Sequence, residues 1–120
     1  MTRDKIIKTF TKYARLGLAA GRLDALEVYA RINGCARTRS EARELLAVYD
    51  TVRFLKISGK EDALRAVCCV YFSQSRRQYS KDGINDRVLR YSMSAGCDAR
   101  TVYRQLAYAV KVYEAVIESY

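Results

Sequence analysis

The residues best suited to bind a partner lie on one predicted helix near the carboxyl end of the chain. Arg100, Arg104 and Lys111 fall on one side of this helix, because successive residues of an α-helix are about 100° apart. The opposite side carries an apolar seam with alternating steps of four and three: Val102, Leu106, Ala109, Tyr113 and Val116. Guanidinium groups bind guanine edges and phosphates, and hydroxyl groups bind phosphates. The basic side therefore predicts contact with DNA.

A turn that contains Gly96 connects this helix to a shorter one before it. The turn is predicted at Ala95–Cys97, the shorter helix is capped by Asn85, and Asp98 caps a recognition helix over about 99–119. This length and glycine content are typical of a helix-turn-helix motif. The amino-terminal part of the second helix of such a motif meets base edges in the major groove. The predicted base contacts are Arg100, Thr101, Tyr103 and Arg104.

Further basic residues near this motif are candidates for contacts with the DNA backbone. They are Arg76, Arg77 and Lys81 in a predicted loop over 73–83, Arg87 and Arg90 on the shorter helix, and Lys111. The alternative is that these cations merely keep a surface helix in water. The chain would then be a non-enzymatic helical interaction or assembly protein, and retention on heparin or duplex DNA separates the two hypotheses.

The composition agrees with a polyanionic partner. The 120 residues carry 22 Lys and Arg against 13 Asp and Glu, a net charge of +9. Such an excess favours nucleic acid over most other partners. The length predicts one domain over 1–120, with an amino-terminal helical part over 1–72 and a helix-turn-helix part over 84–119. No apolar window is long enough for a transmembrane helix, and the first 12 residues lack a signal peptide's apolar stretch, so we expect no membrane partner and a cytoplasmic protein.

The residue types argue against an enzyme. The chain has no histidine, which removes the commonest general base and a common zinc ligand. We predict no catalytic residue, no metal site and no cofactor. The four cysteines form no CxxC pair, and we expect them to be reduced, mostly buried and slow to react: Cys35, Cys68, Cys69 and Cys97.

Helical spacing of apolar residues predicts an all-α fold with about six helices. The first helix should bury Ile6, Phe10 and Tyr13 and turn a basic stripe to water. This stripe consists of Lys5, Lys8, Lys12 and Arg15. The second helix should bury Leu23, Leu26 and Tyr29 and end at a left-handed pair, Asn33–Gly34.

Local signals delimit the other helices. Thr38 and Glu41 form a predicted capping box at the start of the third helix, which Ser58–Gly59 should end. A fourth helix over about 61–72 is apolar on nearly every side and should cross the core. In the fifth, Ile84 should pack on Leu89, and the expected inward residues are Val88, Tyr91, Ser92 and Ala95.

The segment 84–117 resembles the carboxy-terminal region of phage-encoded transcriptional regulators of the ArpU and RinA type. The resemblance rests on the turn Gly96-Cys97-Asp98 and on the run Arg100-Thr101-Val102-Tyr103-Arg104. These regulators resemble region four of bacterial sigma factors, which reads promoter DNA. The resemblance implies a regulator of phage or mobile-element genes, with RNA polymerase as a second partner. Gln105 departs from the pattern, because that place is often apolar, and Leu106 would take over its contact.

Helix-turn-helix proteins often bind DNA as two-fold dimers. The first 60 residues carry no assigned task, and their predicted helices are rich in tyrosine. We therefore predict a homodimer that forms largely through the first three helices.

Overall fold

The computed structural model describes residues 2–18, 24–72 and 81–120, and the side chains of 81 and 82 are excluded from this description. These parts of the chain form six α-helices and contain no strand, which confirms the predicted all-α fold. The helices are α1 (Arg3–Arg15), α2 (Ala25–Cys35), α3 (Arg39–Ile57), α4 (Glu61–Val70), α5 (Lys81–Ala95) and α6 (Ala99–Glu118).

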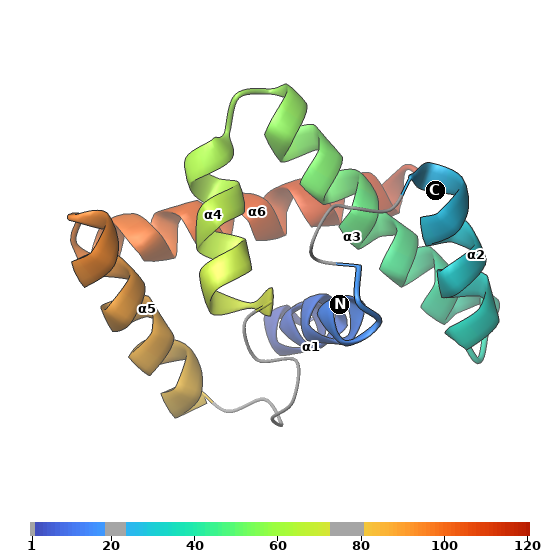
Figure 1. The fold of residues 1–120 in the computed structure, drawn as a ribbon, viewed down its shortest axis with the longest axis horizontal. Coiled ribbons are helices and arrows are strands. Elements are labelled where there is room, and N and C mark those ends of the chain that lie inside the picture. Colours follow the sequence, from blue (N-terminus) through green and yellow to red (C-terminus); the bar gives the residue numbers. More distant parts are fainter. Residues whose placement is uncertain (1, 19–23, 73–80) are drawn as a thin grey trace.

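The long helix α6 organises the other helices. It runs behind α4 and α3 in Figure 1, and both pack against it. Helix α1 packs on α3, α5 contacts α4 and α6, and α2 contacts α3. Helices α5 and α2 lie at opposite ends of the molecule (Figure 1).

An aromatic cluster occupies the centre of the core. The ring of Phe10 from α1 lies 5.5 Å from that of Tyr113 on α6 and 5.7 Å from that of Tyr71, both edge to face. Phe72 adds a fourth ring, 6.1 Å from Phe10. Edge-to-face pairs of this kind stabilise beyond their buried area. The end of α4 is thereby fixed to α1 and α6 by side chains far apart in the sequence.

The ends of α3 agree with the local signals in the sequence. The Thr38 hydroxyl accepts a hydrogen bond from the Glu41 amide at 3.1 Å, as a capping residue should. The returning bond of the box is shifted by one residue, because Glu41 accepts from the amide of Arg37. Gly59 ends the helix with a φ of 76°, and the amide of Lys60 donates to the carbonyl of Leu55. This bond pattern is the Schellman motif.

The predicted inner face of α2 is wrong. Val28 and Ile32 are buried, whereas Leu26 is 79% exposed and Tyr29 is also exposed; Leu23 lies outside the described residues. Leu26 with Tyr29 and Val28 with Ile32 form two different stripes along the same helix. Packing against α3 buries the second stripe. The Asn33–Gly34 pair lies inside the helix with no positive φ, so the predicted left-handed cap is wrong as well.

Helix α5 begins at Lys81, five residues before the first residue of the helix that Asn85 was predicted to cap. Asn85 is therefore an interior residue and not a cap. Leu89 is 55% exposed and does not pack as a staple on the buried Ile84, and Ala95 is also exposed. The part of the predicted loop at 81–83 is helical, and residues 73–80 lie outside the described part of the chain.

The expected burial of the cysteines is also wrong. Cys35 and Cys69 are exposed, and Cys68 and Cys97 are partly buried. Helix α4 ends at Val70. Helices α3, α5 and α6 pack against it and leave one side exposed to water. Its exposed side carries Arg65 and Cys69, so the helix is not apolar on nearly every side.

We expect two thiols of the native protein to react rapidly with an alkylating reagent. Cys35 and Cys69 are exposed, whereas burial raises the pKa of the Cys68 thiol and so lowers its thiolate fraction. Mass spectrometry of the protein after a short pulse of iodoacetamide measures each site. Cys35→Ser and Cys69→Ser should each remove one rapid equivalent. Faster labelling of Cys68 than of Cys69 would contradict the placement of α4.

Candidate nucleic-acid interface

The turn between α5 and α6 is closed by backbone hydrogen bonds. Gly96 has a φ of 72°, in the left-handed region that favours glycine. The amide of Cys97 donates to the carbonyl of Ser92 at 3.1 Å, which again is the Schellman bond. Three residues separate the two helices, and α4 packs against both of them. The structure thus contains a helix pair with a tight turn and a third supporting helix.

Asp98 fixes the first turn of α6. Its Oδ1 atom accepts hydrogen bonds from the amide of Thr101 at 2.8 Å and from the Thr101 hydroxyl at 2.9 Å. These bonds, and the nearby charges of Arg100 and Arg104, lower the pKa of the Asp98 carboxyl below its ordinary value. The bond to the hydroxyl also occupies the donor of one predicted base-contacting residue, Thr101.

The lowered pKa of Asp98 predicts a pH effect on stability. Near its ordinary pKa of 3.8 the unfolded chain holds more protons than the folded one, so this contribution is complete at higher pH. It is lost as the pH falls through the lowered pKa. Asp98→Asn keeps a capping oxygen but removes the titration. Its free energy of unfolding should fall less than that of the parent between about pH 5 and pH 2, as urea titrations followed by circular dichroism would measure. Identical pH profiles would contradict the assignment.

The predicted two sides of α6 are present in the structure. Val102, Leu106, Ala109 and Tyr113 are buried, and Val116 packs partly buried against the core. Arg100, Arg104 and Lys111 are exposed on the opposite side. The residues that the sequence placed on one accessible basic stripe thus share one accessible side of α6.

Tyr103 borders this stripe but connects two helices. Its hydroxyl donates a hydrogen bond to the side-chain oxygen of Asn85 on α5. The ring remains at the surface, and 36% of the residue is exposed. Asn85 therefore positions α5 against α6, a role that its predicted place as a cap did not indicate.

The predicted backbone contacts differ in how accessible they are. Arg90 is exposed, and its Nη2 atom lies 3.0 Å from an Asp86 carboxylate oxygen. Arg87 is partly buried instead. Its Nε atom donates to the carbonyl of Val70 at 2.6 Å, at the end of α4. Burial lowers the pKa of Arg87, and its buried Nη1 atom has no hydrogen-bond partner among the described residues. Arg87 therefore fastens α5 to α4.

The side chains of three other predicted backbone contacts lie outside the described part of the structure. Arg76 and Arg77 lie outside the described residues, and for Lys81 only the helical backbone is described. Neither the tie from Arg87 to Val70 nor that from Tyr103 to Asn85 had a signal in the sequence. Their partners are 17 and 18 residues away, beyond the spacing of any helical pattern.

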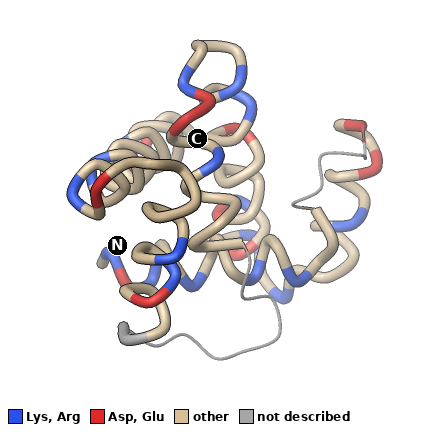
Figure 2. Tube along the Cα trace, turned by 60° about the vertical axis from the view of Figure 1, so that its left-hand side comes forward, with Lys and Arg blue, Asp and Glu red and all other residues tan. Residues whose placement is uncertain are grey.

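Basic residues are not confined to α6. Figure 2 shows Lys and Arg along several parts of the trace, with acidic residues among them. The stripe on α1 is partly matched by α3, since Lys5 lies 3.8 Å from Glu44 and Lys12 forms an ion pair with Glu41. All four residues of the stripe are exposed, as predicted, and two of them also pair with carboxylates of α3.

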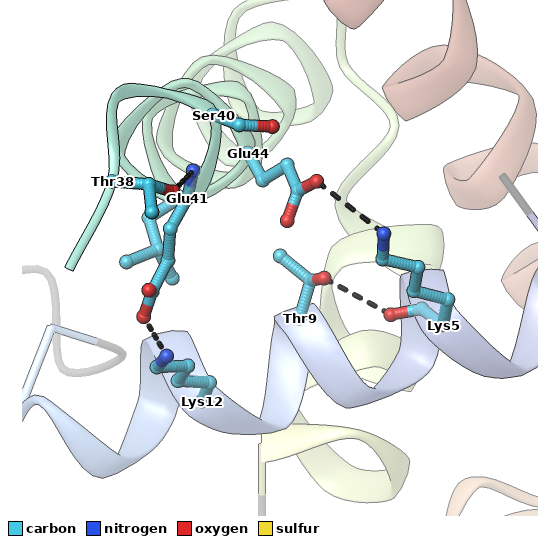
Figure 3. A pocket seen from close by; sticks show the side chains of 8 residues that line it. Lys5, Thr9, Lys12, Thr38, Ser40, Glu41 and Glu44 are labelled. Carbon is cyan, nitrogen blue, oxygen red and sulfur yellow. Dashed lines mark hydrogen bonds and ion pairs between the residues drawn. The ribbon is translucent and has the colours of Figure 1, made fainter. Parts of the chain in front are cut away.

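These ion pairs line a hollow of about 290 Å³ between α1 and the start of α3. Figure 3 shows both lysines directed toward carboxylates of α3, with Thr9 between the lysines and Thr38 beside Glu41. The Thr9 hydroxyl donates to the carbonyl of Lys5 at 3.0 Å. Because its two lysines face two glutamates, the hollow presents no net charge from these pairs to attract an anion.

The described part of the chain contains neither a metal-binding cluster nor a membrane-spanning helix. Within the described ranges, no group of three or more Cys, Asp or Glu side chains could hold a metal ion. No helix in the described part of the chain is both long and apolar enough to cross a membrane. Comparisons with family models, with curated proteins and with solved structures found no match.

Proposed function

We propose that this protein is a sequence-specific DNA-binding transcriptional regulator that reads DNA with α6. The observation that carries the proposal is the accessible stripe of Arg100, Arg104 and Lys111. It lies opposite the buried seam of a helix that follows a tight, glycine-containing turn. A helix held in this way can enter a major groove without disturbing the core, because the stripe lies on the side of α6 opposite the buried seam.

Arg100 and Arg104 are the proposed reading residues. Both lie in the first two turns of α6, and guanidinium groups bind guanine O6 and N7 in a bidentate manner. Thr101 and Tyr103 lie beside them with their hydroxyl donors engaged. Their oxygens can still accept hydrogen bonds, so we assign to them contacts with base amino groups.

The proposed backbone contacts are those cations that the fold leaves available. Lys111 lies on the same stripe, and Arg90 is exposed on α5. We also propose backbone contacts for three cations because of their positive charge alone: Arg76, Arg77 and Lys81. We leave Arg87 out, because its guanidinium is held by the carbonyl of Val70.

The biological setting is proposed from the likeness of 84–117 to regulators of the ArpU and RinA type. It comprises control of phage or mobile-element genes in a bacterial cytoplasm, with RNA polymerase as a second partner. A homodimer through α1, α2 and α3 would bring two copies of α6 to paired half-sites. The proposal includes no catalytic activity, metal or cofactor.

Selection of bound sequences from random duplex DNA tests the proposal directly. A regulator should enrich one short sequence, and its affinity should fall steeply as salt rises. Light scattering of the protein, alone and on the selected duplex, measures the oligomeric state. Weak retention of all duplexes without enrichment would leave a basic protein with no reading function.

Exposed apolar residues on α5 favour a second candidate, an interaction or assembly protein. Leu89 is 55% exposed and Met93 is 83% exposed, one helical turn apart. Single exposed apolar residues are common, but a neighbouring pair is typical of contact surfaces. If this candidate is right, the protein assembles into larger complexes and is not retained on duplex DNA. The double variant Leu89→Ser, Met93→Ser should then no longer assemble.

A further inference from the structure

Two cations from outside the helix pair flank the outer stripe of α6. Arg3, the first residue of α1, shares an open hollow of about 220 Å³ with four residues of α6: Ala107, Val110, Lys111 and Glu114. Lys60, between α3 and α4, places its Nζ atom 5.7 Å from the ring centroid of Tyr108. Both cations are exposed.

Arg3 and Lys60 lie on opposite sides of the stripe. At about 100° per residue, Ala107 lies about 40° from Lys111 on one side, and Tyr108 lies about 60° from it on the other. Arg3 adjoins the first side and Lys60 adjoins the second. The two cations therefore flank the stripe on different sides of α6.

Other contacts hold each cation in place. The Arg3 guanidinium lies near the hydroxyl of Tyr71, which belongs to the central aromatic cluster, and its charge opposes the rise that burial gives the pKa of Tyr71. The Lys60 ammonium lies over the face of Tyr108, and its backbone amide closes the end of α3. A held cation loses less conformational entropy on binding a phosphate than a freely rotating one does.

We propose that Arg3 and Lys60 contact the two DNA strands that border the groove occupied by α6, one strand each. This inference rests on the proposed function. The major groove of B-DNA is about 12 Å wide, so a helix that fills it brings cations on its two flanks to opposite phosphate chains. The DNA-binding surface then comprises the stripe, Arg3 and Lys60. Glu114 lies within the hollow beside Arg3, and the exposed Glu118, one turn farther along α6, marks the carboxyl end of this surface, since carboxylates repel phosphates.

Salt titrations of DNA binding test this inference. Arg3→Gln and Lys60→Gln should each weaken binding to the selected duplex and to a scrambled one by the same factor. Each should also reduce the slope of log affinity against log salt by about 0.9. The ratio of parent to variant affinity should then be about 3.5-fold larger in 50 mM than in 200 mM salt. The double variant should show the product of the two effects.

Two control variants separate this role from others. Arg3→Lys keeps the charge and should keep the salt slope, whereas a purely structural need for the guanidinium beside Tyr71 would make it behave like Arg3→Gln. Arg37→Gln removes one exposed charge between α2 and α3, remote from the turn between α5 and α6 (Figure 1), and should leave the slope unchanged.

The outcomes distinguish the inference from the proposed function. If the parent selects a sequence but Arg3→Gln and Lys60→Gln match Arg37→Gln, the flanking contacts are wrong and the reading helix stands. If the variants weaken the scrambled duplex but not the selected one, the flanking contacts are also wrong. If the parent binds no duplex DNA, both proposals fall.

Discussion

Replacing Phe10 by alanine is expected to lower the free energy of unfolding by about 3–5 kcal/mol. The ring has no exposed surface and touches the rings of Tyr71, Phe72 and Tyr113. Its removal loses the transfer free energy of the side chain and leaves a cavity among three rings that cannot all move inward. Urea unfolding at neutral pH, followed by circular dichroism, measures the change.

A matched variant isolates the contribution of this burial. Phe54→Ala removes the same ring from an exposed position on α3, where 47% of the residue is already in water. Its loss should be much smaller, because less apolar area returns to solvent on unfolding of the parent. Phe10→Leu should lie between the two, since leucine fills part of the space. Equal losses for Phe10→Ala and Phe54→Ala would contradict the packing of Phe10 among Tyr71, Phe72 and Tyr113.

Local signals predicted several helix ends correctly, although the pair Asn33–Gly34 did not. Thr38 and Asp98 cap their helices with hydrogen bonds to amides three residues ahead, and Gly59 and Gly96 adopt the left-handed conformation. Each of these features needs information from within five residues. The seam of α6 was predictable for a related reason, because its alternating steps of four and three leave one apolar side and no competing choice.

The buried face of a helix and its first residue were not predictable where they depend on contacts with distant parts of the chain. In α2 the stripe that contains Leu26 and the one that contains Val28 fit the same periodicity, and packing on α3 selects the second. At α5, Asn85 is a good cap by type, yet its side chain accepts a hydrogen bond from Tyr103. Residue type alone could not reveal either outcome.

In the candidate site, too, the features that follow from local spacing were predictable, and those that depend on tertiary contacts were not. That Arg100 and Arg104 share an exposed side of one helix follows from their spacing, and the structure agrees. That Arg87 is tied to Val70 could not be inferred, because an arginine on an outer helix face and one that reaches a neighbouring helix end look alike in sequence. The same is true of Arg3, whose place beside α6 depends on the packing of α1.

Changing Arg100 or Arg104 to alanine should each cost about 1–3 kcal/mol in binding to the selected duplex. Each change should also relax discrimination at one base pair, because a lost bidentate contact with guanine leaves the other bases equally acceptable there. The fold should survive, since both side chains are exposed. Competition titrations against duplexes with single base-pair changes measure affinity and discrimination together.

Lys111→Ala is the matched comparison on the same stripe. If Lys111 contacts a phosphate, its loss should weaken binding to all duplexes alike and lower the salt slope by about 0.9, without altering discrimination. Neutralising Arg76 with Arg77 should follow the same pattern. The contrast between loss of discrimination and uniform weakening is what defines a reading residue, because phosphates carry no sequence information. If the Arg100→Ala and Arg104→Ala proteins bind every duplex as the parent does, α6 does not read DNA, and the exposed pair Leu89 and Met93 becomes the better guide to function.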